Sequence, residues 1–127
     1  MKELSENINA LSYEIIGAAL EVHRTLGPGL LESVYENALC IEFDHRNIRY
    51  EQQKPIVIEY KGHSIGSGRV DLLVDDLIIV ELKSVENTLP IHQAQVMTYL
   101  KLTDIRLGLL INFNTTLLKN EIKRIAI

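Results

Sequence analysis

The stretch from Arg69 to Lys83 decides the fold and reads Arg-Val-Asp-Leu-Leu-Val-Asp-Asp-Leu-Ile-Ile-Val-Glu-Leu-Lys. Two runs of β-branched and aliphatic residues, 69–74 and 77–83, flank a pair of aspartates, which is typical of two antiparallel strands joined by a short turn. Glu81 lies two residues before Lys83, so a strand directs both side chains to the same face. The stretch therefore predicts a hairpin that carries a carboxylate and a lysine side by side.

The length of the turn decides whether the two strand carboxylates meet. A three-residue loop places Asp71 opposite Glu81, whereas a two-residue turn at Asp75 and Asp76 pairs Asp71 with Val80 and puts the carboxylates on opposite faces. Carboxylates about 5 Å apart repel each other, and a cation between them offsets this cost. The longer loop thus predicts a site for Mg²⁺ or Mn²⁺, which prefer oxygen ligands.

A simpler interpretation is that these charged side chains face solvent. Charged residues are mostly exposed, and Lys83 would then only balance Glu81. The run at 77–82 is nearly continuous in apolar residues, however, which is typical of a strand covered on both faces. Charges in such a strand need a partner or an ion. This pattern favours the metal site.

The rest of the sequence predicts the element order α-α-β-β-β-α-β-β. From Ser5 to Leu26 apolar residues recur at the spacing of an amphipathic helix, and Gly27-Pro28-Gly29 ends it. This pattern indicates helices and a β-sheet in one domain that spans residues 1–127. The other expected elements are a helix that buries Leu31, Tyr35, Leu39 and Phe43 and ends near Arg46 and Asn47, strands at 55–60, 69–74 and 77–83 with a turn at Lys61 and Gly62, a helix at 91–102, and strands at 108–113 and 121–127.

Composition excludes several classes of protein. Hydrophobic residues make up 46% of the chain, yet no apolar run approaches the ~20 residues of a membrane helix, and the charged N-terminus lacks the apolar core of a signal peptide. We therefore expect a cytoplasmic protein without a membrane partner. The formal net charge of −4 argues against indiscriminate coating of nucleic acid. Cys40 is the only cysteine, which excludes an internal disulfide and a thiolate zinc site and indicates a packing role.

Several blocks of the sequence resemble the PD-(D/E)XK nuclease superfamily. Asp71, nine intervening residues and then Glu81-Leu82-Lys83 are similar to its signature, and Gly29 to Tyr35 matches the GxxExxY motif of one subfamily. The resemblance continues in the same order through 23–29, 70–74, 95–101 and 108–113. It implies a restriction-endonuclease-like core of the α/β (α+β) class, with a central mixed β-sheet flanked by helices.

The resemblance also implies roles for individual residues. Asp71, Glu81 and the Leu82 carbonyl would bind a divalent cation, Mg²⁺ or Mn²⁺, and Glu32 would join the metal shell from the second helix. Lys83 would orient or activate the attacking water and stabilise charge on the phosphate. For Glu32 the alternative is a residue of the first helical turn that stabilises the helix dipole.

Gln95 and Tyr99 are four residues apart and so share a helix face. In related nucleases such a pair contacts the active site or the scissile strand. The alternative is a core tyrosine whose edge the glutamine covers. His23 belongs to the family pattern, but we assign it no chemical role.

The expected activity is hydrolysis of phosphodiester bonds in DNA, in preference to RNA, with one or two divalent cations. So small a protein has no evident recognition module, so a homodimer or a partner protein would supply specificity. The alternative is a catalytically inactive module that keeps the nuclease fold and binds nucleic acid or protein. The complete set of Asp71, Glu81 and Lys83 favours the enzyme. The basic candidates for holding the strand are Lys54, Lys61, Arg69, Lys83, Lys119, Lys123 and Arg124.

Overall fold

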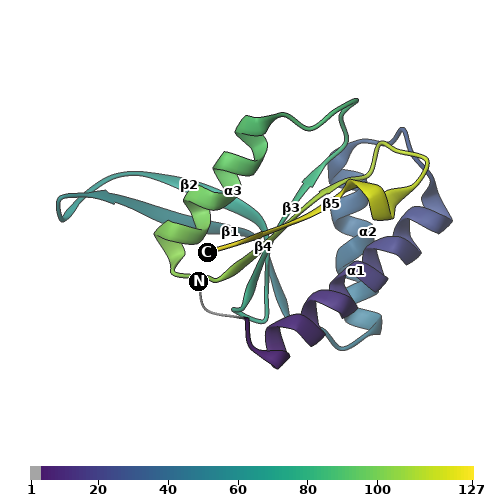
Figure 1. Ribbon diagram of the computed structural model, residues 1–127, viewed down its shortest axis with the longest axis horizontal. Helices are drawn as coiled ribbons and strands as arrows, with labels where there is room; N and C mark the ends of the chain where they lie inside the picture. Colours follow the sequence, from purple (N-terminus) through teal and green to yellow (C-terminus); the bar gives the residue numbers. More distant parts are fainter. Residues whose placement is uncertain (1–3) are drawn as a thin grey trace.

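The chain forms a mixed five-stranded sheet with helices on both faces (Figure 1). The computed structural model describes residues 4–127. The order of the elements confirms the predicted one, with a short 3-10 helix, η1, in addition. In chain order they are α1 (Glu6–Leu26), α2 (Glu32–His45), β1 (Tyr50–Tyr60), β2 (His63–Val74), β3 (Ile78–Lys83), α3 (Pro90–Thr103), β4 (Leu107–Asn112), η1 (Leu118–Glu121) and β5 (Ile122–Ala126).

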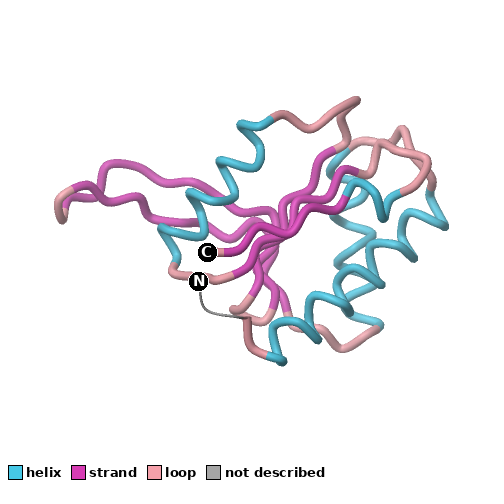
Figure 2. The backbone as a smooth tube through the Cα atoms, viewed as in Figure 1, coloured by secondary structure: helices cyan, strands magenta, loops and turns pink. Residues whose placement is uncertain are grey.

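The order of strands in the sheet follows the chain from β1 to β5. Neighbouring strands are antiparallel, except that β3 and β4 are parallel. A parallel pair needs a crossover connection, which α3 provides. Figures 1 and 2 show α3 on one side of the sheet and the pair α1 and α2 on the other. The sheet is therefore mixed, as predicted, and its central strands are covered on both faces.

Each face of the sheet has its own hydrophobic core. Ile78 and Val80 of β3 pack into the core beneath α1 and α2. The intervening Ile79 packs with Val96 and Leu100 of α3 on the other face. Residues 78–82 of β3 are buried. Successive residues of a strand point to opposite faces, so Glu81 lies on the same side as Ile79.

Helix α1 begins and ends where the sequence predicts. The Ser5 side chain accepts a hydrogen bond from the Ile8 N–H at 3.2 Å, and Gly27 ends the helix with φ 73°. Just beyond the end of α2, Asn47 has φ 57°, the left-handed conformation expected there. The expected burial of Leu31 is wrong: its side chain is 74% exposed, because extended backbone just before α2 directs it outward.

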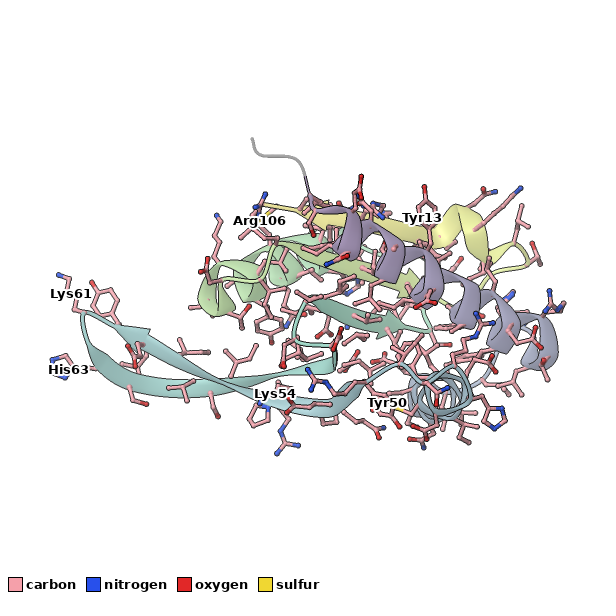
Figure 3. The ribbon with its side chains drawn as sticks, turned by 90° about the horizontal axis from the view of Figure 1, so that it is seen from below. Tyr13, Tyr50, Lys54, Lys61, His63 and Arg106 are labelled. Carbon is pink, nitrogen blue, oxygen red and sulfur yellow. The ribbon has the colours of Figure 1, made fainter. Side chains whose placement is uncertain are left out.

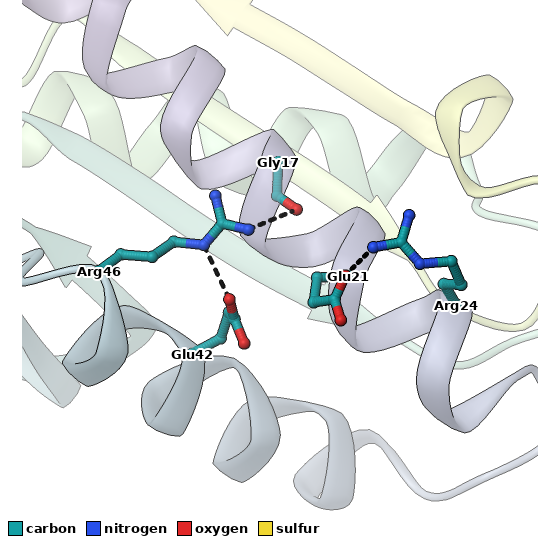
Figure 4. Close-up of polar contacts among 5 residues, drawn as sticks. All are labelled: Gly17, Glu21, Arg24, Glu42 and Arg46. Atoms are coloured by element: carbon teal, nitrogen blue, oxygen red, sulfur yellow. Dashed lines mark hydrogen bonds and ion pairs between the residues drawn. The ribbon is translucent and has the colours of Figure 1, made fainter.

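A polar clamp joins the two N-terminal helices (Figure 4). Arg46, at the end of α2, donates to Glu42 at 2.8 Å and to the Gly17 carbonyl of α1 at 3.5 Å. A Cβ atom on residue 17 would lie 3.2 Å from the guanidinium, so glycine lets Arg46 approach. Glu21 and Arg24 form an ion pair within α1. Of these contacts, the one between Arg46 and the Gly17 carbonyl joins α2, which carries Glu32, to α1.

The β1–β2 hairpin is longer than predicted. Strand β1 begins at Tyr50 and β2 ends at Val74. The outer part of the hairpin projects from the body of the protein, with Lys61 and His63 at its tip (Figure 3). The turn at Lys61 and Gly62 is confirmed, and both residues have positive φ, as two-residue hairpin turns require. The extension escaped prediction because glycine, serine and charged residues there break the alternation of apolar and polar residues.

Candidate active site

The turn between β2 and β3 has the longer of the two predicted lengths. Val74 pairs with Ile78, which leaves three residues in the loop. Asp75 and Asp76 both adopt positive φ, 51° and 56°, and the Leu77 N–H donates to the Val74 carbonyl at 2.9 Å. Aspartate is one of the few residues that enter this conformation readily. The register is therefore the one that brings the strand carboxylates together.

Asp71 and Glu81 meet where the β2–β3 ladder ends. Backbone pairing stops at Leu72 and Val80. Beyond it the side chains replace backbone groups: the Asp71 N–H donates to Glu81 Oε1 at 3.0 Å, and the Leu82 N–H donates to Asp71 Oδ2 at 2.8 Å. Each carboxylate is thus held at one oxygen by a backbone donor. We call the place where β2–β3 backbone pairing ends, beyond Leu72 and Val80, the opening of the sheet.

Glu81 is a buried carboxyl group, only 6% exposed. Burial, followed by the like charge of Asp71, raises its pKa from 4.5 to about 8, while the Asp71 N–H and the Lys83 ammonium act in the opposite direction. Burial and a like charge both disfavour the ionised form, so the pair holds a proton at neutral pH. A cation placed between these oxygens would displace that proton.

Glu32 joins this charged group from the first turn of α2. Burial raises its pKa, Asp71 and Glu36 raise it further, and Lys83 lowers it. The structure thus places Glu32 within electrostatic reach of Asp71 and Lys83, which come from three different elements. Of the predicted site residues, the fold therefore brings together four: Glu32, Asp71, Glu81 and Lys83.

The loop before α2 is held by the tyrosine that ends the Gly29-to-Tyr35 motif. The Tyr35 hydroxyl donates to the Gly27 carbonyl at 2.5 Å and accepts from the Leu30 N–H at 3.1 Å. From the end of β3, the Ser84 hydroxyl donates to the Leu30 carbonyl at 2.6 Å. Tyr35 therefore acts as a structural residue that positions Glu32.

Comparison with known proteins agrees with this geometry. A family model described as the PD-(D/E)XK nuclease superfamily matches residues 9–125. The chain belongs to the PD-(D/E)XK nuclease superfamily. Nucleases of this superfamily generally use divalent metal ions, and their substrates are nucleic acids.

Among solved structures, the crystal structure of SSO0001 is similar to this PD-(D/E)XK chain. The TM-score is 0.51 and the sequence identity 21%, over 73% of this chain and 47% of that one. At this identity the likeness shows a common fold alone, and the chain spans about half the length of that protein. No curated protein matches the chain.

The donor set suits the cations that PD-(D/E)XK nucleases use. No group of three or more His, Cys, Asp and Glu residues within residues 4–127 is arranged to hold a metal ion by itself. Mg²⁺, however, usually binds through one or two carboxylates and keeps several water molecules. The Asp71 and Glu81 oxygens at the opening of the sheet fit that mode.

No helix within residues 4–127 is long and apolar enough to cross a membrane.

The sequence interpretation missed a cluster behind Asp71. Glu36, only 7% exposed, accepts hydrogen bonds from the Gln53 amide at 2.9 and 3.1 Å and from the Gln52 amide at 2.7 Å. The Gln53 amide also lies 3.4 Å from Asp71 Oδ1. A signal for this cluster was present, because Glu32 and Glu36 lie four apart on one helix face and two like charges there need a compensating partner.

Gln53 achieves this contact with a strained backbone. Its φ is 54°, although it lies within β1. Gln52 pairs with Leu72 and Lys54 with Val70 in one register, but Gln53 forms no regular pair between them. A non-glycine residue in this conformation costs on the order of 1 kcal/mol, and such strain clusters at functional sites. The kink turns the Gln53 amide toward Asp71.

Glycine should therefore be tolerated better than alanine at this position. Gln53→Ala and Gln53→Gly both lose the amide contacts, but only alanine keeps the strain, so we expect the glycine variant to be more stable by about 1 kcal/mol. Urea denaturation of the two variants measures the difference. In a regular strand the order is reversed, because glycine is the less favourable residue there. A more stable alanine variant would contradict the strain.

Gln95 and Tyr99 form a pair on α3, as their spacing predicts. The Gln95 amide donates to the Tyr99 hydroxyl at 3.3 Å. The ring of Tyr99 packs against Gly68 of β2, where a Cβ atom would lie 3.3 Å from it. Within residues 4–127 neither side chain hydrogen-bonds to the carboxylates of the site. Gln95 is exposed and Tyr99 half-buried, so this pair lies on the α3 side of the sheet with its polar edge open.

The structure also shows the surroundings of His23 and Cys40. His23 Nε2 lies 2.7 Å from the Thr115 carbonyl, which ties the end of α1 to the loop after β4. Cys40 is buried in α2, and burial raises the pKa of its thiol to about 11. A thiol that stays protonated at neutral pH is not a nucleophile. The observed surroundings of Cys40 agree with a packing residue.

Proposed function

We propose that this chain is a divalent-metal-dependent nuclease of the GxxExxY subfamily that hydrolyses phosphodiester bonds in DNA, in preference to RNA. The observation that carries the proposal is the buried Glu81 carboxyl group beside Asp71, with Lys83 on the same strand. Buried charges are costly unless they are paired or bind an ion. Nothing in the packing of the β2–β3 hairpin requires three charged side chains where the sheet opens.

Asp71, Glu81, the Leu82 carbonyl and Glu32 are the residues that we assign to Mg²⁺ or Mn²⁺. When bound, the cation supplies a water molecule of lowered pKa and charge stabilisation at the phosphate. The Leu82 N–H already points into the opening, toward Asp71. In an antiparallel ladder the carbonyl of a residue faces the same neighbouring strand as its N–H, which supports Leu82 as a ligand.

Lys83 is assigned to the attacking water and the phosphate. Its ammonium group is a compact point charge on a half-buried strand residue, close enough to Glu32 and Glu81 to lower the pKa of both. From this position it stabilises negative charge that develops on the phosphate. Gln95 and Tyr99 are assigned to the scissile strand because their polar edge is open. We still predict that a homodimer or a partner protein supplies specificity. We also still predict a cytoplasmic location.

A cleavage assay tests the proposal. Purified protein is incubated with single-stranded, double-stranded and branched DNA and with RNA, each with Mn²⁺, Mg²⁺ or EDTA. We expect cleavage of DNA with metal and none with EDTA. The Glu81→Gln variant, which keeps the size of the side chain, is the control and should be inactive. Cleavage in EDTA, or equal cleavage by the variant, would contradict the proposal. Binding of nucleic acid without cleavage in any condition would favour the inactive module.

A further inference from the structure

The β1–β2 hairpin carries an arm, residues 54–69, that continues the strand of Asp71 away from the body. Figure 3 shows the outer part of the arm standing clear of the helices and of the rest of the sheet, with Lys61 and His63 at the tip. Val57, Tyr60 and Ile65 are 62%, 60% and 63% exposed. A two-stranded ribbon is only marginally stable by itself, so apolar side chains left open on it indicate a surface that binds something.

The charge of the arm is opposite to that of the whole protein. It carries three cationic side chains, Lys54, Lys61 and Arg69, against one anionic side chain, Glu59, whereas the protein has a formal net charge of −4. Lys54 pairs with Glu51 at 2.9 Å. Lys61 and Arg69 form no ion pair within residues 4–127. Positive charge is therefore gathered on the projecting element, where it suits a polyanion.

The arm is also thin. The stretch from His63 to Gly68 consists of small residues apart from His63 and Ile65. Gly68 accommodates the ring of Tyr99, but a Cβ atom on Gly66 would have nothing within 4 Å, and the φ of Gly66 is not positive. Gly66 pairs with Ile58 directly beside a shift in the β1–β2 register. Glycine inside a strand often marks such a bulge or the close approach of another molecule, and the empty space at Gly66 leaves room for the second.

We propose that the arm lies in the major groove of duplex DNA, with Lys61 and Arg69 on the phosphates. This inference rests on the proposed nuclease function and names its substrate class. The major groove of B-form DNA admits a two-stranded β-ribbon, whereas the deep, narrow major groove of duplex RNA does not.

The length of the arm sets how far along the duplex it reaches. At a rise of about 3.4 Å per residue, the eight residues from Asp71 to His63 span about 27 Å. This distance is about eight base pairs of DNA. The tip therefore contacts the duplex within about one helical turn of the carboxylates. A second copy of the chain is the other possible occupant, but two basic arms repel each other.

Fluorescence anisotropy in EDTA separates binding from cleavage. We compare a labelled duplex of 24 base pairs with a single strand of the same length. Lys61→Glu should raise Kd for the duplex by about tenfold at low salt and reduce the salt dependence of binding by about one phosphate contact. The matched control is Arg24→Glu near the end of α1, which makes the same change of charge on a 73% exposed side chain and should have little effect. Helix α1 ends on the side of the molecule away from the arm (Figure 1).

A second variant tests the groove without changing charge. Gly66→Val fills space that is open in the free protein, so the melting temperature should not fall, while binding of the 24-base-pair duplex should weaken by several-fold. A duplex of six base pairs is too short to reach both the carboxylates and the tip. On it the wild type and Lys61→Glu should bind equally.

The outcomes separate the arm from the nuclease site. If the wild type cleaves duplex DNA but Lys61→Glu and Gly66→Val bind it as the wild type does, the arm proposal alone fails. Equal weakening by Lys61→Glu and Arg24→Glu would also overturn it, because only net charge would then matter. Tighter binding of the single strand, or a dimer in sedimentation that the arm variants dissociate, would assign the arm to another occupant. If the wild type neither binds nor cleaves DNA, the proposed function fails as well.

Discussion

Replacing Lys83 by alanine is expected to reduce DNA cleavage by about a hundredfold or more, to background in an endpoint assay, while Mn²⁺ still binds. Lys83 acts on water and phosphate, whereas the oxygens of Asp71 and Glu81 hold the cation. Its ammonium also competes electrostatically with a cation for these carboxylates, so its loss should leave metal affinity unchanged or slightly higher. Calorimetry with Mn²⁺ and single-turnover cleavage of a labelled duplex measure the two effects separately.

The control for this variant is Lys101→Ala on the exposed surface of α3, which removes the same charge away from the carboxylates. It should cleave and bind metal as the wild type does. Undiminished cleavage by Lys83→Ala would remove Lys83 from the mechanism. Loss of Mn²⁺ binding together with cleavage would show instead that the lysine only maintains the folded site.

The β2–β3 hairpin was predictable, but its turn left two registers open. Asp75 and Asp76 suit the left-handed conformations of a two-residue turn as well as those of a longer loop, and an apolar run covered on both faces does not decide between them. The charges of Asp71, Glu81 and Lys83 favoured the register in which Asp71 meets Glu81, and the structure has that register. Glu32 was placed by the motif at 29–35, and its position depends on a break at Gly27 that the sequence displays directly.

The kink at Gln53 and the arm were not predictable in this way. Nothing in the sequence distinguishes Gln53 from Gln52, because the positive φ of Gln53 comes from its tertiary contacts with Glu36 and Asp71. The outer part of the arm contributes little to either core, so burial imposes no alternation on it. Pattern analysis detects buried faces, and it fails where strands extend into solvent or where a polar cluster overrides regular geometry.

Asp71→Asn should leave the metal-free protein as stable as the wild type or more stable, by on the order of 1 kcal/mol. The new asparagine side chain keeps the shape, its oxygen can accept from the Leu82 N–H, and its amide can donate to Glu81. The substitution also removes a like charge that raises the pKa of Glu81. Wild type, however, should gain stability from Mn²⁺, because a ligand that binds only the folded state stabilises it by mass action. The variant should lose most of that gain and all nuclease activity.

The pH dependence gives the same test a second readout. Folded Glu81 has a pKa of about 8 against the ordinary glutamate value of 4.5, so between these values the folded protein binds more protons than the unfolded chain. The stability that this proton contributes is complete below about pH 4.5 and is lost as the pH rises toward 8. This loss of stability should be smaller in Asp71→Asn, because the charge of Asp71 is the second cause of the raised pKa of Glu81.

Thermal melts of both proteins at pH 5 and pH 8, with and without Mn²⁺, measure these effects. If Asp71 only pairs within the hairpin, the variant should be destabilised at both pH values and Mn²⁺ should shift neither melting curve, which would contradict the metal site.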